Sequence, residues 1–161
     1  MNSLSIKTKF GWISALEQRN KIVKVKFGKH KNKSVSKNLK RFGINLSNFL
    51  KRKSNIFESD FLIEGNTIQK KVWKELIRIK LGKTKSYGEI AKKFKLSPRH
   101  VGKICAQNKI AIAIPCHRVV RSDGSMGGFS ARGGIVLKKK ILDLIILIIS
   151  CFCITPDWRQ S

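Results

Sequence analysis

The segment that most constrains this chain is an apolar run that leads into a proline and a cysteine, Ile110–Val120. Its β-branched residues predict a short buried strand, because isoleucine suits a pleated, half-buried surface. Pro115 has no backbone N–H for a ladder, so we expect the strand to end there and to present Cys116 at the margin of a core. Cysteine reacts as its thiolate, and the neighbouring His117 and Arg118 are expected to lower the pKa of the thiol. Cys116 is therefore a candidate nucleophile, with a small core residue as the plain alternative.

The charge of the chain predicts a polyanionic partner. Its 161 residues, enough for one ordinary domain or two small ones, contain 35 Lys and Arg against 9 Asp and Glu, so the formal net charge is +26. Nucleic acid is the simplest partner for such a surface, and an anionic membrane is the alternative. The basic segment 21–53 contains no acidic residue, and a solvated surface explains it as well as a binding site does.

The cysteines are expected to be free thiols: Cys105, Cys116, Cys151 and Cys153. The N-terminus has no apolar signal segment, which favours a reducing, cytoplasmic setting. No Cys-x-x-Cys pair has a matching His or Cys pair, so we expect no structural zinc. The apolar run from Leu144 to Ile154 is too short to span a bilayer, which takes about 20 residues.

Periodicity predicts a strand-rich start and a helical remainder. Residues 10–15 and 22–27 flank a polar turn and predict a β-hairpin. Residues 29–55 predict a lysine-rich loop followed by one or two short helices. Residues 66–80 place apolar side chains on one helical face that packs on the core, with Asn66 or the following threonine as the N-cap.

Two short helices joined by a tight turn form a helix-turn-helix candidate. The first runs from its cap Ser86 to Lys95, and the second opens with Ser97 as the N-cap and Pro98 in the first position. A plain αα-hairpin is the alternative, but the basic residues on the second helix favour contact with DNA.

A glycine-rich loop, 121–134, follows the cysteine motif. Glycine lets the backbone approach a ligand closely and expose its N–H groups, so we expect this loop to line the same pocket as Cys116. A flexible surface loop is the alternative. A last helix is expected to begin near Ile135.

Together these motifs resemble the O6-alkylguanine-DNA alkyltransferases, also called methylated-DNA–protein-cysteine methyltransferases. The resemblance covers about residues 66–144, and the residues before it resemble the family's variable N-terminal domain more loosely. The matching motifs, in chain order, are Val72-Trp73, Ser86–Ala91, Ser97–Gly102, Asn108, Pro115–Val119 and Gly127–Ser130.

The resemblance implies an α/β (α+β) fold in two parts. A small, strand-rich α/β domain, ribonuclease H-like, would take residues 1–62. A mainly helical domain with a winged-helix-like helix-turn-helix and the active-site cysteine would take residues 63–144. Residues 145–161 match no part of the family and are expected to form an aberrant apolar tail.

The resemblance also implies DNA repair by single-turnover alkyl transfer. Cys116 would accept the alkyl group from O6 of guanine irreversibly, with no cofactor and no metal. His117 would deprotonate the thiol through a water, while Asn108 and Arg118 would support the active site.

The implied partner is double-stranded DNA that contains O6-alkylguanine, bound by a monomer through the minor groove; no membrane partner is implied. The damaged base would be rotated out of the duplex. Tyr87 would contact the target phosphate and the flipped base, and Arg99 would fill the vacated place. The backbone of Val119 and Ser130 would read the edges of the guanine.

One departure from the family concerns the partner of the histidine. The family has a glutamate on the last helix, and here Ile145 stands at that position. Without this acceptor, His117 loses help with its orientation and with the charge that it gains as a base. Asp143 lies two residues earlier, about 200° away around an ideal helix, so it should not substitute. We therefore expect a weaker thiolate and impaired transfer.

Three other functional classes stay open. A non-catalytic binder of alkylated DNA would keep Tyr87 and Arg99 but transfer poorly. A helix-turn-helix transcription regulator would select undamaged sequences and would have no use for the cysteine motif. A cysteine peptidase is disfavoured, because His117 follows Cys116 directly instead of arriving from elsewhere in the fold.

Overall fold

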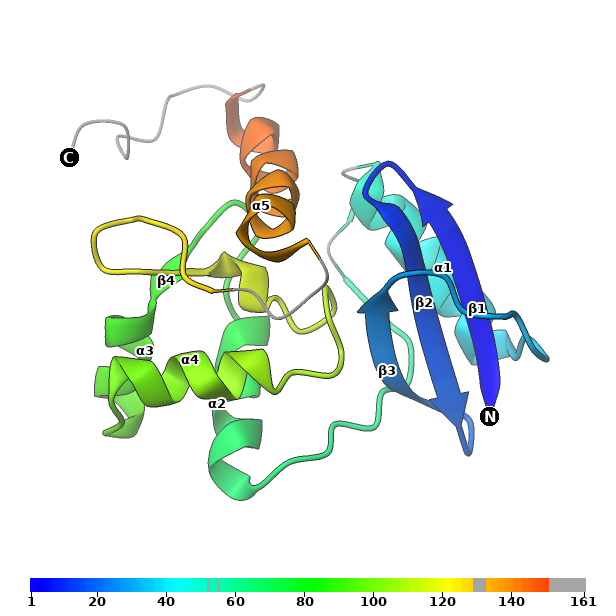
Figure 1. The fold of residues 1–161 in the computed structure, drawn as a ribbon, viewed down its shortest axis with the longest axis horizontal. Coiled ribbons are helices and arrows are strands. Elements are labelled where there is room, and N and C mark those ends of the chain that lie inside the picture. The colour runs from blue at the N-terminus through cyan, green and yellow to red at the C-terminus, as the bar shows by residue number, and fades with distance from the viewer. Residues whose placement is uncertain (52, 55, 129–132, 151–161) are drawn as a thin grey trace.

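The computed structural model describes the fold of residues 1–51, 53–54, 56–128 and 133–150, with side chains up to residue 144. The chain is a mixed α+β structure, as expected. A strand-rich N-terminal unit and a mainly helical C-terminal unit lie side by side (Figure 1). The predicted tail residues Cys151 and Cys153 lie outside the described residues.

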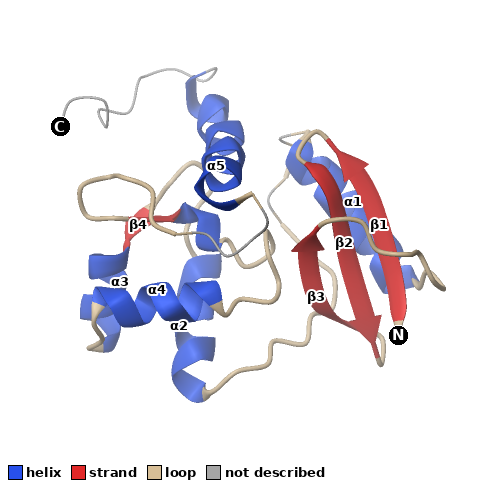
Figure 2. Ribbon diagram, in the orientation of Figure 1, coloured by secondary structure: helices blue, strands red, loops and turns tan. Residues whose placement is uncertain are grey.

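An antiparallel three-stranded sheet forms the N-terminal unit, with one helix packed on one face (Figure 2). Its elements are β1 (Asn2–Thr8), β2 (Gly11–Gln18), β3 (Lys21–Phe27) and α1 (Lys37–Leu50). Arg19 and Asn20 join β2 to β3 with φ angles of 49° and 61°. Positive φ at both central residues gives the tight turn that matches the twist of a hairpin, so the predicted hairpin is confirmed.

Helix α1 is one continuous helix where the sequence predicted one or two short ones. Its N-cap is Ser36, whose side chain accepts a hydrogen bond from the backbone of Leu39. Leu39, Phe42 and Leu46 recur at helical spacing and are fully buried against the sheet. The apolar residues that looked loosely patterned in the sequence therefore form one core-facing stripe.

Four helices and a minimal parallel sheet build the described C-terminal unit. They are α2 (Thr67–Ile77), β4 (Lys85–Ser86), α3 (Tyr87–Phe94), α4 (Pro98–Ala106), β5 (Val119–Val120) and α5 (Gly134–Ser150). Asn66, Ser86 and Ser97 cap α2, α3 and α4 by accepting hydrogen bonds from backbone N–H groups, which confirms all three predicted starts. Among the described residues, no helix is both long and apolar enough to cross a membrane.

The prediction of a strand before Cys116 is wrong. Between Ile110 and Ile114 the chain makes isolated bridges and a tight turn centred on Ile112, whose φ is 71°. The N–H of Ala113 donates to the carbonyl of Ala111 at 2.9 Å, and that of Ile114 donates to the carbonyl of Ile110 at 3.0 Å. These local bonds replace a ladder. Positive φ is unusual for a β-branched residue and stores strain of about 1–3 kcal/mol beside the candidate nucleophile.

A buried carboxylate ties α2 to the elements that follow it. The side chain of Glu75 is only 3% exposed, and it pairs with Lys85 of β4 and Lys93 of α3, both at 2.7 Å. The hydrogen bonds from these two ammonium groups hold the pKa of the Glu75 carboxyl below its ordinary value. One side chain thus fixes α3, and with it the position of Tyr87, relative to α2.

Replacing Glu75 by glutamine should lower the free energy of unfolding by about 1 kcal/mol, a figure reduced from that of a fully buried pair because both lysines are half exposed. Urea denaturation measures the loss. Glu64→Gln is the matched control, because its pair with Lys109 is about 60% exposed on both sides and should contribute close to nothing. Equal stabilities of Glu75→Gln and Glu64→Gln would contradict this role of Glu75.

Candidate active site

Cys116 opens a single 3₁₀ turn, Cys116–Arg118, directly after Pro115. Its backbone N–H donates to the carbonyl of Ile114 at 2.8 Å, which closes the irregular segment onto the turn. The residue is 7% exposed and packs within the hydrophobic core. The thiol is thus more deeply placed than the sequence predicted.

The side chain of Asn108 holds this segment in place. Its Oδ1 accepts from the backbone of Ile110 at 2.8 Å, and its Nδ2 donates to the carbonyl of Ile114 at 3.0 Å. The same Nδ2 lies 3.4 Å from Sγ of Cys116 and donates to it. The amide therefore satisfies backbone groups of a buried turn that forms no regular strand, and it supplies a donor that favours negative charge on sulfur.

The expected lowering of the thiol pKa is wrong. Burial raises the pKa of Cys116 above its ordinary value, and the Asn108 hydrogen bond and the charge of Lys138 offset this effect only in part. Arg118, which was expected to help, points elsewhere: its Nη1 donates to the carbonyl of Ile79 at 2.7 Å. Burial also lowers the pKa of Arg118 to about 10. Its role in the structure is to anchor the 3₁₀ turn to the chain just after α2.

His117 is neutral in this environment. It is 1% exposed, and burial, followed by the charges of Arg118 and Lys138, holds the pKa of its imidazole well below the ordinary value. Its Nε2 is buried and has no hydrogen-bond partner among the described residues. Asp143, which was predicted not to substitute for the family's glutamate, is exposed. The side chain of Ile145 lies outside the described residues.

Lys138 of α5 is a site residue that the sequence analysis missed. It is completely buried, and its Nζ donates to the carbonyl of Val119 at 2.6 Å and to the hydroxyl of Tyr87 at 3.2 Å. Burial lowers its pKa, while Cys116 and Cys105 act in the opposite direction. The missed signal was helical spacing, because Lys138 precedes the buried Ile141 and Leu142 by three and four positions.

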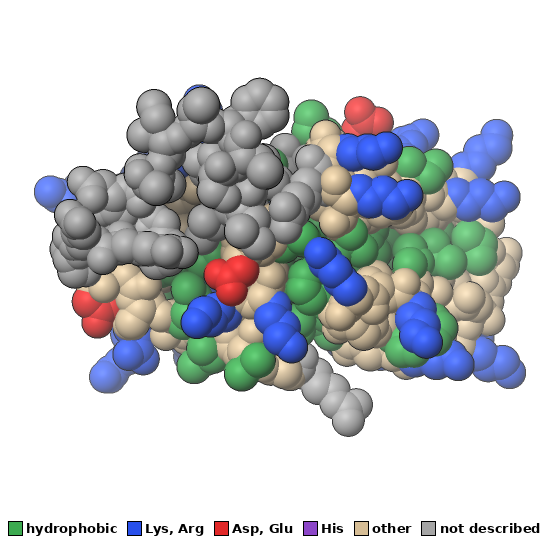
Figure 3. Space-filling view, turned by 90° about the horizontal axis from the view of Figure 1, so that it is seen from above, with side chains coloured by type: hydrophobic (Ala, Val, Ile, Leu, Met, Phe, Trp, Pro, Cys, Tyr) green, Lys and Arg blue, Asp and Glu red, His purple; other side chains and the backbone are tan. Residues whose placement is uncertain are grey.

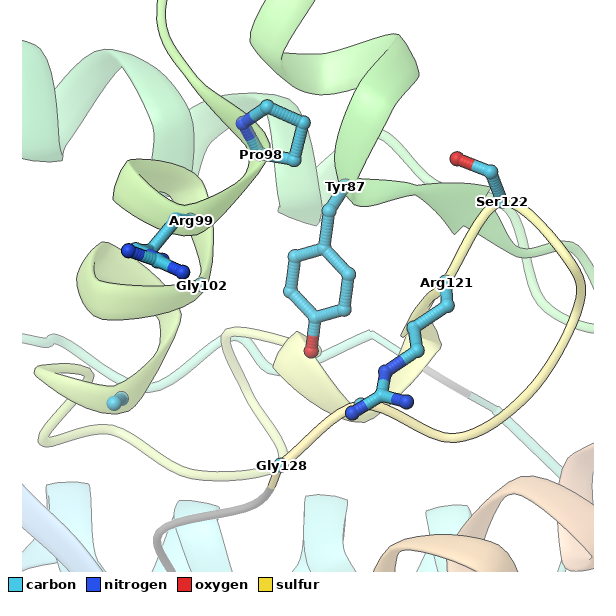
Figure 4. Close-up of a pocket in the computed structure, with 9 residues that line it drawn as sticks. Tyr87, Pro98, Arg99, Gly102, Arg121, Ser122 and Gly128 are labelled. Carbon is cyan, nitrogen blue, oxygen red and sulfur yellow. The ribbon is translucent and has the colours of Figure 1, made fainter.

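A surface pocket of about 730 Å³ opens between α3, α4 and the loop after β5. Tyr87 stands at its centre, between Arg99 of α4 and Arg121 of the loop (Figure 4). Burial raises the pKa of Tyr87 to about 12, so its hydroxyl stays protonated. A Cβ on Gly127 would lie 2.5 Å from the ring of Tyr87, so glycine is required for this close approach.

The structure brings several of the predicted site residues together. Asn108 contacts Cys116, and Lys138 links the hydroxyl of Tyr87 to the backbone of Val119. Cys116 itself does not line the pocket described above. Arg99 lies on the pocket wall and is exposed, while Ser130 falls outside the described residues.

Comparisons with known proteins match this arrangement. Residues 67–144 match the family model of the 6-O-methylguanine DNA methyltransferase DNA-binding domain. A methylated-DNA–protein-cysteine methyltransferase of Metallosphaera sedula is 35% identical over 138 residues, which cover 84% of this chain and 86% of that protein. The chain belongs to the methylated-DNA–protein-cysteine methyltransferase family.

Another methyltransferase of this family, from Sulfolobus acidocaldarius, is 47% identical over 79 residues, and the match spans about half of each chain, 49% of both. Among solved structures, the Mycobacterium tuberculosis protein titled OGT in complex with DNA has a TM-score of 0.79 and 26% identity, covering 91% of this chain and 94% of that chain. The similarity to that structure extends over the N-terminal unit as well as the helical one.

In this member of the methyltransferase family, the buried thiol of Cys116 is expected to react slowly with small alkylating reagents. Because the pKa of Cys116 is raised, the thiolate is scarce at neutral pH and its fraction grows as pH rises toward that pKa. Iodoacetamide labelling of Cys116, followed by peptide mass spectrometry, should be slower than labelling of a free cysteine peptide and should keep accelerating through pH 8. A rate that levels off below pH 7 would contradict the raised pKa.

The same assay tests Lys138. Lys138→Met removes a cation near the sulfur, which raises the pKa of the Cys116 thiol further, and should cut the labelling rate at pH 8 several-fold because the thiolate fraction falls. Lys139→Met, on the exposed side of α5, should leave the rate unchanged. A circular dichroism melt of each variant separates loss of the thiolate from loss of the fold.

Proposed function

We propose that this protein repairs DNA by transferring a methyl or other alkyl group from O6 of guanine irreversibly to Cys116. The observation that carries the proposal is the cluster around the thiol: Asn108 donates to its sulfur, and Lys138 joins the neighbouring turn to Tyr87. A buried core cysteine would need neither a donor on its sulfur nor a buried cation close by. No cofactor or metal takes part in the proposed transfer.

In the proposed reaction, the Cys116 thiol loses its proton to His117, through a water, and the sulfur attacks the alkyl carbon in line with the C–O bond. The C–O bond breaks, and its electron pair stays on the guanine. The free Nε2 of His117 is suited to take the proton, because the imidazole is neutral. Tyr87 accepts a hydrogen bond from Lys138 and stays protonated, so its own proton remains available for the base.

The proposed partner is duplex DNA with O6-alkylguanine, bound at the minor groove by the helix-turn-helix of α3 and α4 in a winged-helix-like arrangement. The damaged base would leave the stack and enter the pocket beside Tyr87. Arg99, exposed on the pocket wall, is suited to fill the space that the flipped base leaves in the duplex. The backbone of Val119 and Ser130 would read the edges of the guanine.

We further propose that the protein is a monomer and works in the cytoplasm.

The division of the chain at residues 62 and 144, and the ribonuclease H-like nature of the first part, stay predictions. Helix α5 continues past the second boundary to Ser150.

A binder of alkylated DNA that does not transfer is the second candidate. One observation favours it: burial raises the pKa of Cys116 and lowers that of His117, so both groups resist the charges that they would carry as thiolate and imidazolium. The two candidates differ only in whether Cys116 becomes covalently alkylated.

Intact-protein mass spectrometry after incubation with a duplex carrying one O6-methylguanine decides between them. The expected result is a gain of one methyl group by the unmodified sequence and none by Cys116→Ser, with Cys105→Ser gaining it normally. Binding of the damaged duplex without any mass gain would establish the binder instead. Loss of binding as well as transfer would contradict both.

Restoring the family's glutamate should accelerate transfer. Ile145→Glu is expected to raise the single-turnover rate by about tenfold or more, because a carboxylate that accepts from the imidazole stabilises its protonated form. Ile146→Glu adds the same charge one position later, about 100° around the helix, and should not accelerate the reaction. Quenched-flow methyl transfer measures both variants, and an equal effect of the two would show that only net charge matters.

A further inference from the structure

The sheet face opposite α1 is basic. Leu4, Ile6, Ile13, Ala15 and Val25 point toward α1, so the alternating residues of each strand point away from it. Around Trp12, this outer face and the loop that crosses it carry six lysines: Lys7, Lys24, Lys26, Lys29, Lys31 and Lys33. Lys and Arg side chains are spread over the N-terminal part of the molecule, on the right of Figure 3.

The loop that carries three of these lysines is fixed by the sheet beneath it. Buried serines of β1 and β2 donate to its backbone carbonyls, and Oδ1 of Asn32 accepts from the backbone N–H of Ser5 at 2.7 Å. The serine bonds are Ser14 to Gly28 at 2.5 Å, Ser5 to His30 at 2.6 Å and Ser3 to Lys31 at 2.7 Å. A surface loop that merely keeps the chain soluble would not need such anchoring.

Nothing among the described residues neutralises this face. None of its six lysines takes part in an ion pair in the described part of the chain. The carboxylate on the nearest strand, that of Glu17, is 1% exposed and is occupied by Asn2 and Ser36. Nζ of Lys29 lies 4.9 Å from the ring centre of Trp12, which holds that ammonium group over the sheet.

We propose that this outer sheet face is a second nucleic-acid-binding surface, separate from the pocket at Tyr87, that contacts the sugar–phosphate backbone without reading sequence. Like charges held together on a fixed loop repel one another, and a row of phosphates removes that cost while releasing condensed counterions. Because the loop backbone is already ordered, little conformational entropy is lost on binding. The surface does not depend on alkyl transfer at Cys116.

The test compares two triple variants in a Cys116→Ser background, so that no covalent product forms. Lys29→Gln, Lys31→Gln and Lys33→Gln remove charge from the outer face. Lys37→Gln, Lys40→Gln and Lys51→Gln remove the same charge from exposed positions on and next to α1, on the opposite face of the same sheet. Affinity for an undamaged duplex is measured over a series of salt concentrations by fluorescence anisotropy.

For the outer-face variant we expect weaker binding and a plot of log affinity against log salt that is shallower by about two to three, since each phosphate contact contributes about 0.9 to that slope. The α1 variant should bind with nearly the slope of the Cys116→Ser parent. DNA should also quench the fluorescence of Trp12, seen as the difference between the parent and Trp12→Phe.

Equal slopes for the two triple variants would overturn the proposal, because the effect would then come from net charge alone. No change in either variant, with no quenching of Trp12, would overturn it as well. Binding of the outer face to vesicles rich in anionic lipid, but not to DNA, would assign the surface to a membrane instead. If Cys116 fails to be methylated while the slopes differ as expected, the proposed repair reaction fails and this surface stands.

Discussion

The fold around the thiol depends on how the chain satisfies the backbone of a buried segment that forms no regular strand. Irregular backbone normally stays at the surface, because its polar groups need partners. Here the segment before Cys116 is buried, and an amide side chain adds to the segment's own turn bonds and its bridge to β3 in satisfying the backbone. Asn108 binds a donor at the start of the segment and an acceptor at its end, and its remaining N–H reaches the sulfur. The side chain of Asn108 therefore both supports the turn and affects the pKa of the Cys116 thiol.

A second constraint is the burial of Lys138. Its ammonium group bonds the carbonyl of Val119 and the hydroxyl of Tyr87, so the last helix, the turn after the cysteine and the first helix of the helix-turn-helix meet at one cation. The same charge stabilises a thiolate on Cys116 and opposes an imidazolium on His117. A cation placed there makes the sulfur more acidic and the neighbouring base weaker, so an acceptor for the imidazole is most needed in this arrangement.

Local chemistry made much of the fold predictable. Asn66, Ser86 and Ser97 satisfy helix N-termini through bonds made within a few residues, so the sequence alone fixes those starts. The same reasoning failed for the segment Ile110–Ile114, because its strand-like composition gives no sign of the tight turn at Ile112 or of the Asn108 side chain that bonds its backbone. Lys138 was hidden among three consecutive lysines, and only its spacing from Ile141 could have distinguished it. The pKa direction of Cys116 failed for a related reason, since adjacency in sequence did not bring the guanidinium of Arg118 toward the sulfur.

Burial has opposite consequences for reactivity and for selectivity. A thiol kept neutral within the core reacts slowly with small electrophiles in solution, because the anion that would attack them is disfavoured there. In the proposed reaction, a base bound beside Tyr87 would have to bring its alkyl carbon to a sulfur that does not line the pocket, and it could accept the proton of Tyr87 as charge develops. If Cys116 is consumed in one reaction, as we propose, its low intrinsic reactivity would protect the site until a matching base arrives. The hydrogen bond from Asn108 and the charge of Lys138 both favour the thiolate, so they reduce the activation that the thiol would still need in the proposed reaction.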